Sequence, residues 1–363
     1  MIKYLGSKRR LVGELGALVS DCGATTALDL FTGTTRVAQE FCRRGVFTTA
    51  VDTAAYSEVL AQCYVVTDAA DIDQEAVAEA LGRLSALPGR RGYVTEVFAE
   101  KARYFHPDNA LRIDAIRDGI DEFYPDGPLR PILLTSLLEA ADAVDSTVGL
   151  QMAYLKEWAP RALRPLRLRQ PVLTPGTGRA IRDDARAAAR QLPAVDLAYL
   201  DPPYNQHRYF TNYHVWETLV RWDAPDYYGV ACKRVDARDA ATKSDFNSKR
   251  RMPDALAEVI DGVRADVVVV SFSNEGHLPI EALQDMLAGR GHPVEVLAYD
   301  TRRYIGSVIG IYSPNGVKVG NVGHSTNTEY LLVSAPEEVL ARLDASGGAA
   351  AGAGAGERAV SRR

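Results

Sequence analysis

Short, mostly apolar runs recur along the chain and predict the strands of a parallel sheet. They lack the 3.6-residue spacing of an amphipathic helix, and strands that are covered on both faces have this composition. The runs occupy residues 27–31, 46–51, 195–200, 266–271, 294–298 and 329–333. Helical segments separate several of these runs, so the chain is predicted to belong to the α/β class.

Two different patterns mark the C-terminal part of the chain. Residues 305–319 are predicted to form a β-hairpin that turns at Pro314-Asn315-Gly316, because Asn-Gly suits the backbone of a tight hairpin turn. Residues 344–363 are rich in Gly and Ala and end in arginines. That composition is typical of a disordered tail.

Helical spacing dominates residues 71–174, where strand signals are scarce. Helices are predicted at residues 72–87, 110–123, 131–143 and 150–158, separated by segments that contain Pro and Gly. We therefore predict a catalytic domain formed by residues 1–70 and 175–335, with residues 71–174 as a helical insertion.

The run at 195–200 ends in Asp201-Pro202-Pro203-Tyr204. The two prolines lack N–H donors and stop the strand, so Asp201 is predicted at the carboxyl edge of the sheet, where ligands of open α/β sheets bind. Asp201 and the Pro202 carbonyl offer two fixed acceptors, which suit an amino group with two N–H donors, and Tyr204 offers a flat face for a ring. The alternative is an ordinary strand-to-loop turn.

The run at 27–31 leads into a loop of small residues that contains Gly33, and the next strand ends at Asp52. A strand, a small-residue turn and a helix let a cofactor approach the backbone at the helix N-terminus. An acid at the end of the second strand is where Rossmann-like folds bind a ribose. Alternatively, Asp52 caps the following helix. A helix is also predicted after Ser7, with Lys8, Arg9 and Arg10 in its first turn.

Composition limits the choice of function without selecting one. The chain has 363 residues, a formal net charge of -5 and 47% hydrophobic residues, which is ordinary for a soluble globular protein. Its four cysteines are far apart, so reduced cytoplasmic thiols are expected rather than disulfides or a metal site. No apolar run reaches the roughly 18 residues of a membrane span, and no signal peptide is visible.

Basic and aromatic residues gather in three places. Residues 205–217 are dense in aromatic and amide side chains, which can stack on bases and read their edges. The alternative for Tyr213 and Trp216 is burial against the helical insertion. A basic polar loop covers residues 243–251. The insertion ends in Lys156, Arg161, Arg164, Arg167 and Arg169, which form either a solvated face or a phosphate-binding one.

Two of these motifs resemble those of known enzymes. Asp201-Pro202-Pro203-Tyr204 resembles the catalytic motif of the amino-methyltransferases, and Lys3-Tyr4-Leu5-Gly6-Ser7-Lys8 resembles the opening motif of the Dam-type DNA adenine methylases. The resemblance implies a Rossmann-like class I methyltransferase sheet with an antiparallel terminal hairpin, plus a helical insertion that serves as the DNA target-recognition region. It also implies S-adenosylmethionine as the cofactor.

The resemblance assigns roles to individual residues. Catalysis falls to Asp201, Pro202, Pro203 and Tyr204, and the residues expected to bind the cofactor are Tyr4, Lys8, Asp29, Phe31, Gly33, Asp52, Asp184 and Asp201. The chain departs from the family's cofactor loop at Thr35, where a second glycine is usual. The residues expected to contact DNA are Arg208, Tyr209, Asn212, Tyr213, Lys243, Lys249 and Arg250.

The expected reaction is methylation of adenine N6 in double-stranded DNA, in the cytoplasm and without a metal. Residues 205–217 resemble those of enzymes from restriction or defence systems, so a cognate restriction endonuclease is a candidate partner. Methylation of cytosine N4 is an alternative, because it needs the same acceptors. A catalytically silent DNA-binding relative is another.

Overall fold

A computed structural model describes residues 2–6, 8–176, 178–302, 326–350 and 359–362. The chain forms two compact units and passes between them several times. Unit 1 contains Met1–Gly16, Phe31–Ala185 and His207–Ser244, and unit 2 contains Ala17–Leu30, Arg186–Gln206 and Asp245–Arg363. No helix in the described ranges is both long and apolar enough to cross a membrane.

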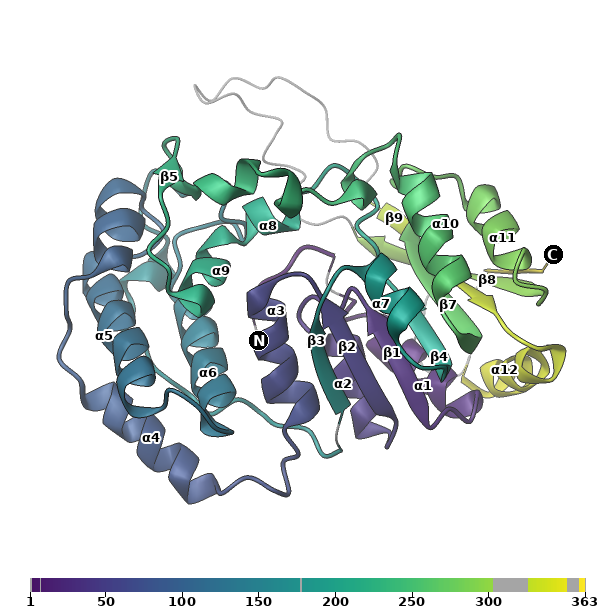
Figure 1. Cartoon of the computed structure of the whole chain (residues 1–363), viewed down its shortest axis with the longest axis horizontal. Helices are drawn as coiled ribbons and strands as arrows, with labels where there is room; N and C mark the ends of the chain where they lie inside the picture. Colours follow the sequence, from purple (N-terminus) through teal and green to yellow (C-terminus); the bar gives the residue numbers. More distant parts are fainter. Residues whose placement is uncertain (1, 7, 177, 303–325, 351–358, 363) are drawn as a thin grey trace. The chain divides into compact units, whose positions relative to one another are not determined.

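Unit 2 is built on strands with a parallel centre and an antiparallel end (Figure 1). Strand β4 lies between β1 and β7 and is parallel to both. Strand β9 is antiparallel to β7 and to β8, and β10 is antiparallel to β8. The strands are β1 (Thr26–Leu30), β4 (Val195–Leu200), β7 (Ala265–Ser273), β8 (Val294–Arg302), β9 (Thr326–Ser334) and β10 (Ala359–Arg362).

Apolar burial explains this strand pattern. Residues 267–270 of β7 are all buried, as are Leu197, Ala198, Tyr199 and Leu200 of β4, so side chains of both faces are covered. Helix α11 packs against β8 and β9, and α10 contacts α11. The helices of this unit are α7 (Ala185–Gln191), α10 (Met252–Gly262), α11 (Ile280–Ala288) and α12 (Glu337–Ala350), while α1 (Val12–Asp21) runs from unit 1 into unit 2.

Unit 1 contains a parallel pair of strands, β2 (Phe47–Asp52) and β3 (Gly178–Arg182), in which Asp52 lies opposite Arg182. Helix α2 (Arg36–Arg43) packs on β2, and α3 (Ala55–Ala61) contacts both strands. Helix α3 continues into a π-helical turn at Gln62–Val66. The two strands therefore end at the same edge of the sheet, and α3 begins there.

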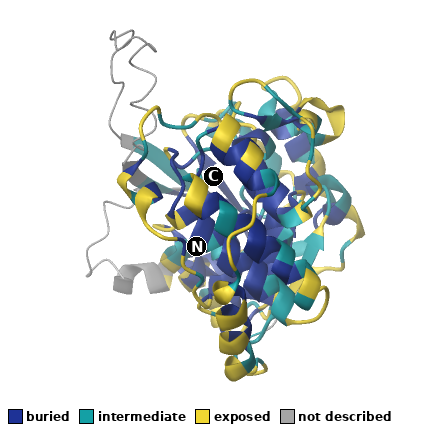
Figure 2. Cartoon of the chain, turned by 90° about the vertical axis from the view of Figure 1, so that its left-hand side faces the viewer, coloured by how far each residue is buried: buried dark blue, intermediate teal, exposed yellow. Residues whose placement is uncertain are grey.

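The 71–174 segment of unit 1 is a layer of packed helices, drawn in blue and teal in Figure 1. Helices α4, α5 and α6 contact one another, and a π-helix packs on α5. Figure 2 shows their buried residues in dark blue on the inner faces, with exposed residues on loops and outer turns. The bounds are α4 (Gln74–Ala86), the π-helix η2 (Val94–Lys101), α5 (Pro107–Phe123), α6 (Leu129–Ala143) and a 3-10 turn at Pro160–Leu163.

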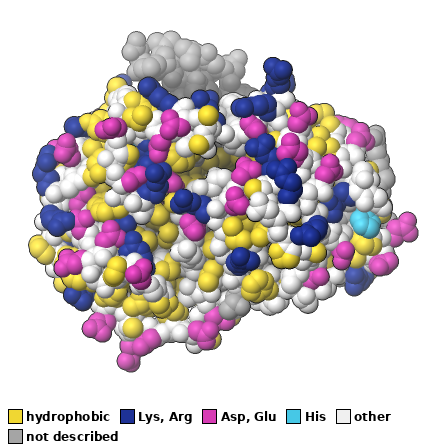
Figure 3. Space-filling view, viewed as in Figure 1, with side chains coloured by type: hydrophobic (Ala, Val, Ile, Leu, Met, Phe, Trp, Pro, Cys, Tyr) yellow, Lys and Arg dark blue, Asp and Glu magenta, His cyan; other side chains and the backbone are white. Residues whose placement is uncertain are grey.

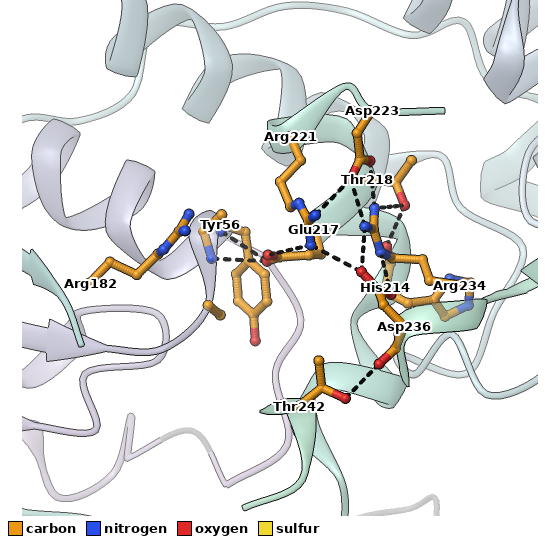
Figure 4. Close-up of polar contacts among 12 residues, drawn as sticks. Tyr56, Arg182, His214, Glu217, Thr218, Arg221, Asp223, Arg234, Asp236 and Thr242 are labelled. Atoms are coloured by element: carbon orange, nitrogen blue, oxygen red, sulfur yellow. Dashed lines mark hydrogen bonds and ion pairs between the residues drawn. The ribbon is translucent and has the colours of Figure 1, made fainter. Parts of the chain in front are cut away.

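The remainder of unit 1 follows the Asp-Pro-Pro-Tyr corner in sequence. Helices α8 (Tyr209–Asn212) and α9 (His214–Arg221) lead into a short hairpin of β5 (Tyr227–Tyr228) and β6 (Lys233–Arg234). Arg234, 1% exposed, binds the Asp223 carboxylate through two nitrogens at 2.7 Å each and also pairs with Asp236 at 2.7 Å (Figure 4). Three 3-10 turns follow, at Val235–Arg238, Ala240–Thr242 and Asp245–Asn247, the last in unit 2.

Most of the fold predicted from the sequence is confirmed. The α/β class, the parallel centre and the antiparallel terminal strands agree with the predicted Rossmann-like sheet. The helix predicted at 150–158 is wrong, because tertiary hydrogen bonds recruit its backbone: Gln151 N–H donates to Asn212 O at 2.8 Å and Leu155 N–H to Ser146 O at 3.0 Å. Placing Lys8, Arg9 and Arg10 in a helical first turn is also wrong, since α1 begins only at Val12.

Some predictions about the C-terminal part stay predictions. The hairpin at 305–319 lies outside the described residues. Within the predicted tail, residues 344–350 continue α12 and Ala359–Arg362 form β10, whereas residues 351–358 and 363 lie outside the described ranges. The predicted domain boundaries differ from the two compact units, because the helices of 71–174 share unit 1 with β2 and β3.

Candidate functional site

The Asp-Pro-Pro-Tyr corner belongs to unit 2 and leaves the carboxyl end of β4. Pro202 is buried, while Asp201 and Tyr204 are half-buried. The Tyr204 ring meets the Phe272 ring of β7 edge-on, with centroids 5.8 Å apart, and the Tyr204 carbonyl accepts the N–H of His277 at 2.8 Å. These contacts and the two prolines fix the corner, so the Asp201 carboxylate and the Pro202 carbonyl are held on a rigid backbone.

The loop that follows β1 lies in unit 1 and has unusual backbone angles. Phe31, Gly33 and Thr35 have φ values of 146°, 52° and 63°. Thr35 adopts the left-handed conformation at the N-terminus of α2, where only glycine is free of steric cost. Its hydroxyl donates to Thr34 O at 2.7 Å and accepts from Gln39 Nε2 at 2.8 Å, which helps to hold a loop that lacks the family's second glycine.

Asp52 links this loop to α3. Its Oδ2 accepts the Gly33 N–H at 2.9 Å, and its Oδ1 accepts the Ala54 N–H at 3.0 Å. Burial raises the pKa of Asp52, while the backbone N–H donors lower it. A Cβ at Gly33 would lie 3.0 Å from the Tyr4 ring, which is tighter than an ordinary Cβ contact, so the ring lies close over the loop.

Tyr4 lies in a cluster of four tyrosine rings, all in unit 1. It stacks on Tyr213 with centroids 4.6 Å apart and planes 17° from parallel, and its other neighbours are Tyr209 at 5.3 Å and Tyr56 at 6.5 Å. The Tyr4 and Tyr56 hydroxyls are 3.4 Å apart. Burial raises the pKa values of both well above the ordinary tyrosine range, so the rings stay neutral. The cluster is an uncharged aromatic wall beside Gly33.

Glu217 of α9 supports the same region and was not predicted from the sequence. It is 3% exposed, and its Oε2 accepts the N–H groups of Ala55 at 2.9 Å and Tyr56 at 3.4 Å (Figure 4). Burial raises its pKa. Because Ala54 has no side chain to cap α3, Glu217 and Asp52 together satisfy its first N–H groups. The sequence signal for a buried Glu217 is its position directly after Trp216, an aromatic residue that is itself buried.

The other residues expected to bind the cofactor are buried or half-buried. Lys8 is 6% exposed in unit 1, and Asp29 is 1% exposed on β1 of unit 2. Asp184 is half-buried and follows Asp183, whose N–H donates to Asp52 O at 3.1 Å. Asp184 therefore lies in the segment that adjoins Asp52.

The residues expected to contact DNA divide into two groups. Arg208, Lys243, Lys249 and Arg250 are exposed. Asn212 and Tyr213 are 3% and 0% exposed, which argues against direct contact with DNA, and Tyr209 is half-buried against Tyr4. The Tyr213 hydroxyl instead accepts the Leu5 N–H at 2.5 Å. The aromatic segment thus contributes more to positioning Tyr4 than to the surface.

Two chemical features bear on the other classes of site. Within the described residues, no group of three or more His, Cys, Asp or Glu side chains could hold a metal ion. All four cysteines are free thiols, and burial raises the pKa of Cys63 to about 12. A thiol with a raised pKa is a poor nucleophile near neutral pH.

Comparisons with known proteins identify the family. The sequence profile of the D12 class N6 adenine-specific DNA methyltransferases matches residues 4–282, which include the opening motif from Tyr4 onward and the Asp-Pro-Pro-Tyr corner. The type II methyltransferase M.NlaIII of Neisseria lactamica is 28% identical over 349 residues, which cover 92% of this chain and 98% of that protein.

Two longer relatives match over only part of their length. The modification methylase LlaI of Lactococcus lactis subsp. lactis is 27% identical over 324 residues, covering 84% of this chain and 51% of that protein. The type II methyltransferase M.FokI of Planomicrobium okeanokoites is 26% identical over 314 residues, covering 80% and 47%. The chain thus spans about half the length of these two relatives. The family resemblance and the S-adenosylmethionine cofactor expected from the sequence are confirmed, and the chain belongs to the D12 class of N6 adenine-specific DNA methyltransferases.

Proposed function

We propose that this protein methylates the exocyclic N6 of adenine in double-stranded DNA. The observation that carries the proposal is the Asp201-Pro202-Pro203-Tyr204 corner, which leaves the carboxyl end of a buried parallel strand inside the segment matched by the family. An adenine inside the duplex is inaccessible, so the base is extruded before reaction, at a cost of a few kcal/mol for unstacking.

Asp201 and the Pro202 carbonyl accept the two N–H groups of the extruded amine. This directs the nitrogen lone pair away from the ring and stabilises the positive charge that develops on nitrogen. Tyr204 stacks on the base, and its contact with Phe272 limits the motion of its ring. When bound, S-adenosylmethionine would supply the methyl group: the N–C bond would form as the S–C bond breaks, leaving the thioether product, and the nitrogen would release one proton to water. Alignment by these residues accounts for much of the acceleration.

Tyr4, Phe31, Gly33 and Asp52 are proposed to hold the cofactor, together with the residues that the resemblance adds, Lys8, Asp29 and Asp184. The loop at Gly33 fits this role, because its backbone lies close under the Tyr4 ring, where a Cβ would make a tight contact at 3.0 Å, and its N–H is fixed by Asp52. Neutral tyrosine faces beside the loop also suit a sulfonium cation, since ring quadrupoles attract positive charge.

The expected biological setting is restriction–modification. The names of the relatives support it: LlaI is a modification methylase, and M.NlaIII and M.FokI are type II methyltransferases. By this proposal the chain protects host DNA from a cognate restriction endonuclease, which would cut the same sequence when it is unmethylated.

The decisive experiment incubates the protein with labelled S-adenosylmethionine and unmethylated duplex DNA, followed by digestion to nucleosides. Label in N6-methyldeoxyadenosine is expected for the wild type and for Asp254→Ala, which removes an exposed carboxylate from α10, and no label for Asp201→Ala. Label in N4-methylcytosine would keep the chemistry and change the base. Cofactor binding without label on DNA of varied sequence would indicate the silent relative.

A further inference from the structure

An acid-free stretch is the most basic part of this acidic protein. Residues 159–182 contain six arginines and no Asp or Glu, in a chain of net charge -5. Two of the six are held in ion pairs: Arg161 lies 2.7 Å from Asp145, and Arg182 lies 3.9 Å from Glu58. Figure 3 shows acidic and basic side chains interspersed over the face drawn there. Whether an arginine can bind an outside anion therefore depends on whether a neighbouring carboxylate already pairs with it.

Three of the remaining arginines form what we call the arginine strip: Arg164, Arg167 and Arg169. All three are exposed, and within the described residues none of their guanidinium groups has a hydrogen bond or an ion pair. The basic cluster noted in the sequence thus separates into Arg161, which is structural, and a strip whose charge is not neutralised by the protein.

The backbone of the strip is fixed by two buried polar side chains. Asn109, 4% exposed, donates from Nδ2 to Ala162 O and Arg164 O, and its Oδ1 accepts the Leu166 N–H, each at 2.9 Å. Ser136, 1% exposed, donates to Arg169 O at 2.6 Å and accepts the Arg169 N–H at 3.1 Å. Each end of the strip is therefore anchored to a helix, α5 or α6.

Local sequence directs the arginines outward. Leu166 is buried and Leu168 half-buried, while Arg167 and Arg169 between and after them are exposed, the alternation of an extended chain. Pro160, Pro165 and Pro171 fix φ along the segment. Less backbone entropy is lost on binding from such a segment than from a flexible basic tail.

The strip begins near the opening motif of unit 1. Asp145, which pairs with Arg161, also pairs with Lys3 at 3.0 Å, and Lys3 precedes Tyr4. Arg161 is three residues before the first member of the strip. A polyanion bound along the strip would therefore pass close to the N-terminal motif.

We propose that the arginine strip binds the phosphate backbone of double-stranded DNA. The proposal rests on the proposed function, which makes DNA the polyanion that the protein meets. Guanidinium groups match phosphate geometry and stay charged at any working pH. An extended chain rises roughly 3.3 Å per residue, and one DNA strand advances roughly 3.4 Å along the helix axis per nucleotide. Because the two advances are similar, arginines spaced along the chain can follow phosphates spaced along the strand. Such contacts add affinity without reading sequence.

The test replaces all three members of the strip, in the variant Arg164→Gln, Arg167→Gln and Arg169→Gln. The affinity for a DNA duplex is measured by fluorescence anisotropy at several salt concentrations between roughly 50 and 300 mM, because the dependence of affinity on salt reports the release of counterions from DNA. The slope of log K against log salt is negative, and each lost phosphate contact makes it less steep by about 0.9, so a decrease in steepness of about 2.7 is expected for three. S-adenosylmethionine binding and the positions of methylation stay unchanged.

The matched control is Arg90→Gln, Arg91→Gln and Lys101→Gln, which removes the same charge from the same unit. These cations already pair with Asp118, Glu100 and Glu96, so their loss has little effect on the slope. If the slope is unchanged in the strip variant and the wild-type protein methylates DNA, the result overturns DNA binding by the strip and leaves the proposed function intact. If the slope becomes less steep as expected but the wild-type protein leaves DNA unmethylated, the result supports DNA binding by the strip and overturns the proposed function.

Discussion

The rings of Tyr4 and Tyr213 are stacked, with their centroids 4.6 Å apart. The two residues are distant in sequence: Leu5, which follows Tyr4, is 208 positions before Tyr213. The Tyr213 hydroxyl accepts the Leu5 N–H at 2.5 Å, so the same side chain holds the opening motif through its ring and through its hydroxyl. Tyr213 is fully buried. The aromatic segment that follows the Asp-Pro-Pro-Tyr corner in sequence therefore positions a residue expected to bind the cofactor.

Tyr213→Phe is expected to keep the stacked ring and lose the hydrogen bond to Leu5. A buried hydrogen bond contributes about 1 kcal/mol, so the affinity for S-adenosylmethionine should fall by about fivefold in isothermal titration calorimetry. Tyr124→Phe is the control, since within the described residues the Tyr124 hydroxyl has no hydrogen-bond partner. Equal affinities in the two variants would show that Tyr213 does not position Tyr4.

Gly33→Ala and Gly45→Ala separate backbone strain from steric contact. Both residues have positive φ, at 52° and 81°, so a Cβ at either position costs about 1 kcal/mol in stability. Only at Gly33 would the Cβ meet another group, the Tyr4 ring at 3.0 Å, whereas the Cβ at Gly45 has no atom within 4 Å among the described residues. Gly33→Ala should therefore weaken cofactor binding at least tenfold, and Gly45→Ala should lower only the melting temperature.

Thr35 gives a prediction about the cost of the missing second glycine. Thr35→Ala and Thr35→Gly both remove the hydroxyl that bonds Thr34 and Gln39, but only the glycine relieves the left-handed backbone at φ 63°. The glycine variant should be more stable than the alanine variant by about 1 kcal/mol in chemical denaturation. If alanine is the more stable of the two, Thr35 is not strained.

The parts of the site that could be predicted are those that local sequence determines. The corner at Asp201 follows from a buried strand stopped by two prolines, and β4 has the predicted bounds. The loop at Gly33 and the acid Asp52 follow from the strand–turn–helix order. In each case the signal lies within a few residues of the element that it specifies.

The contacts between distant segments could not be predicted. Nothing in residues 205–217 distinguishes an aromatic ring that stacks on a base from one that stacks on Tyr4, so Tyr213 was expected to contact DNA. Glu217 was overlooked for the same reason, because its partners, the N–H groups of Ala55 and Tyr56, are more than 160 positions away. The helix predicted at 150–158 also depended on contacts invisible in its own sequence.

Asp142 gives the clearest pH dependence. It lies at the end of α6, is 7% exposed, and accepts the Lys3 N–H at 3.1 Å. Burial raises the pKa of Asp142 to about 6, with Asp145 acting in the same direction and Lys3 opposing it. A folded-state pKa above the unfolded value of about 4 means that the folded protein holds the proton more tightly. The resulting stabilisation is complete below about pH 4 and is lost as the pH rises through about 6.

Asp142→Asn should therefore remove this pH dependence, because the amide does not ionise in this pH range. The free energy of unfolding of the wild type, relative to the variant, should fall by on the order of 3 kcal/mol between about pH 4 and pH 7, since each pKa unit corresponds to about 1.4 kcal/mol. Urea denaturation at several pH values measures the difference, and Asp126→Asn, in an exposed turn, gives the baseline for the loss of one carboxylate. A relative stability that rises with pH instead would mean that the ion pair with Lys3 outweighs the burial of Asp142, and that the opening motif is held by charge.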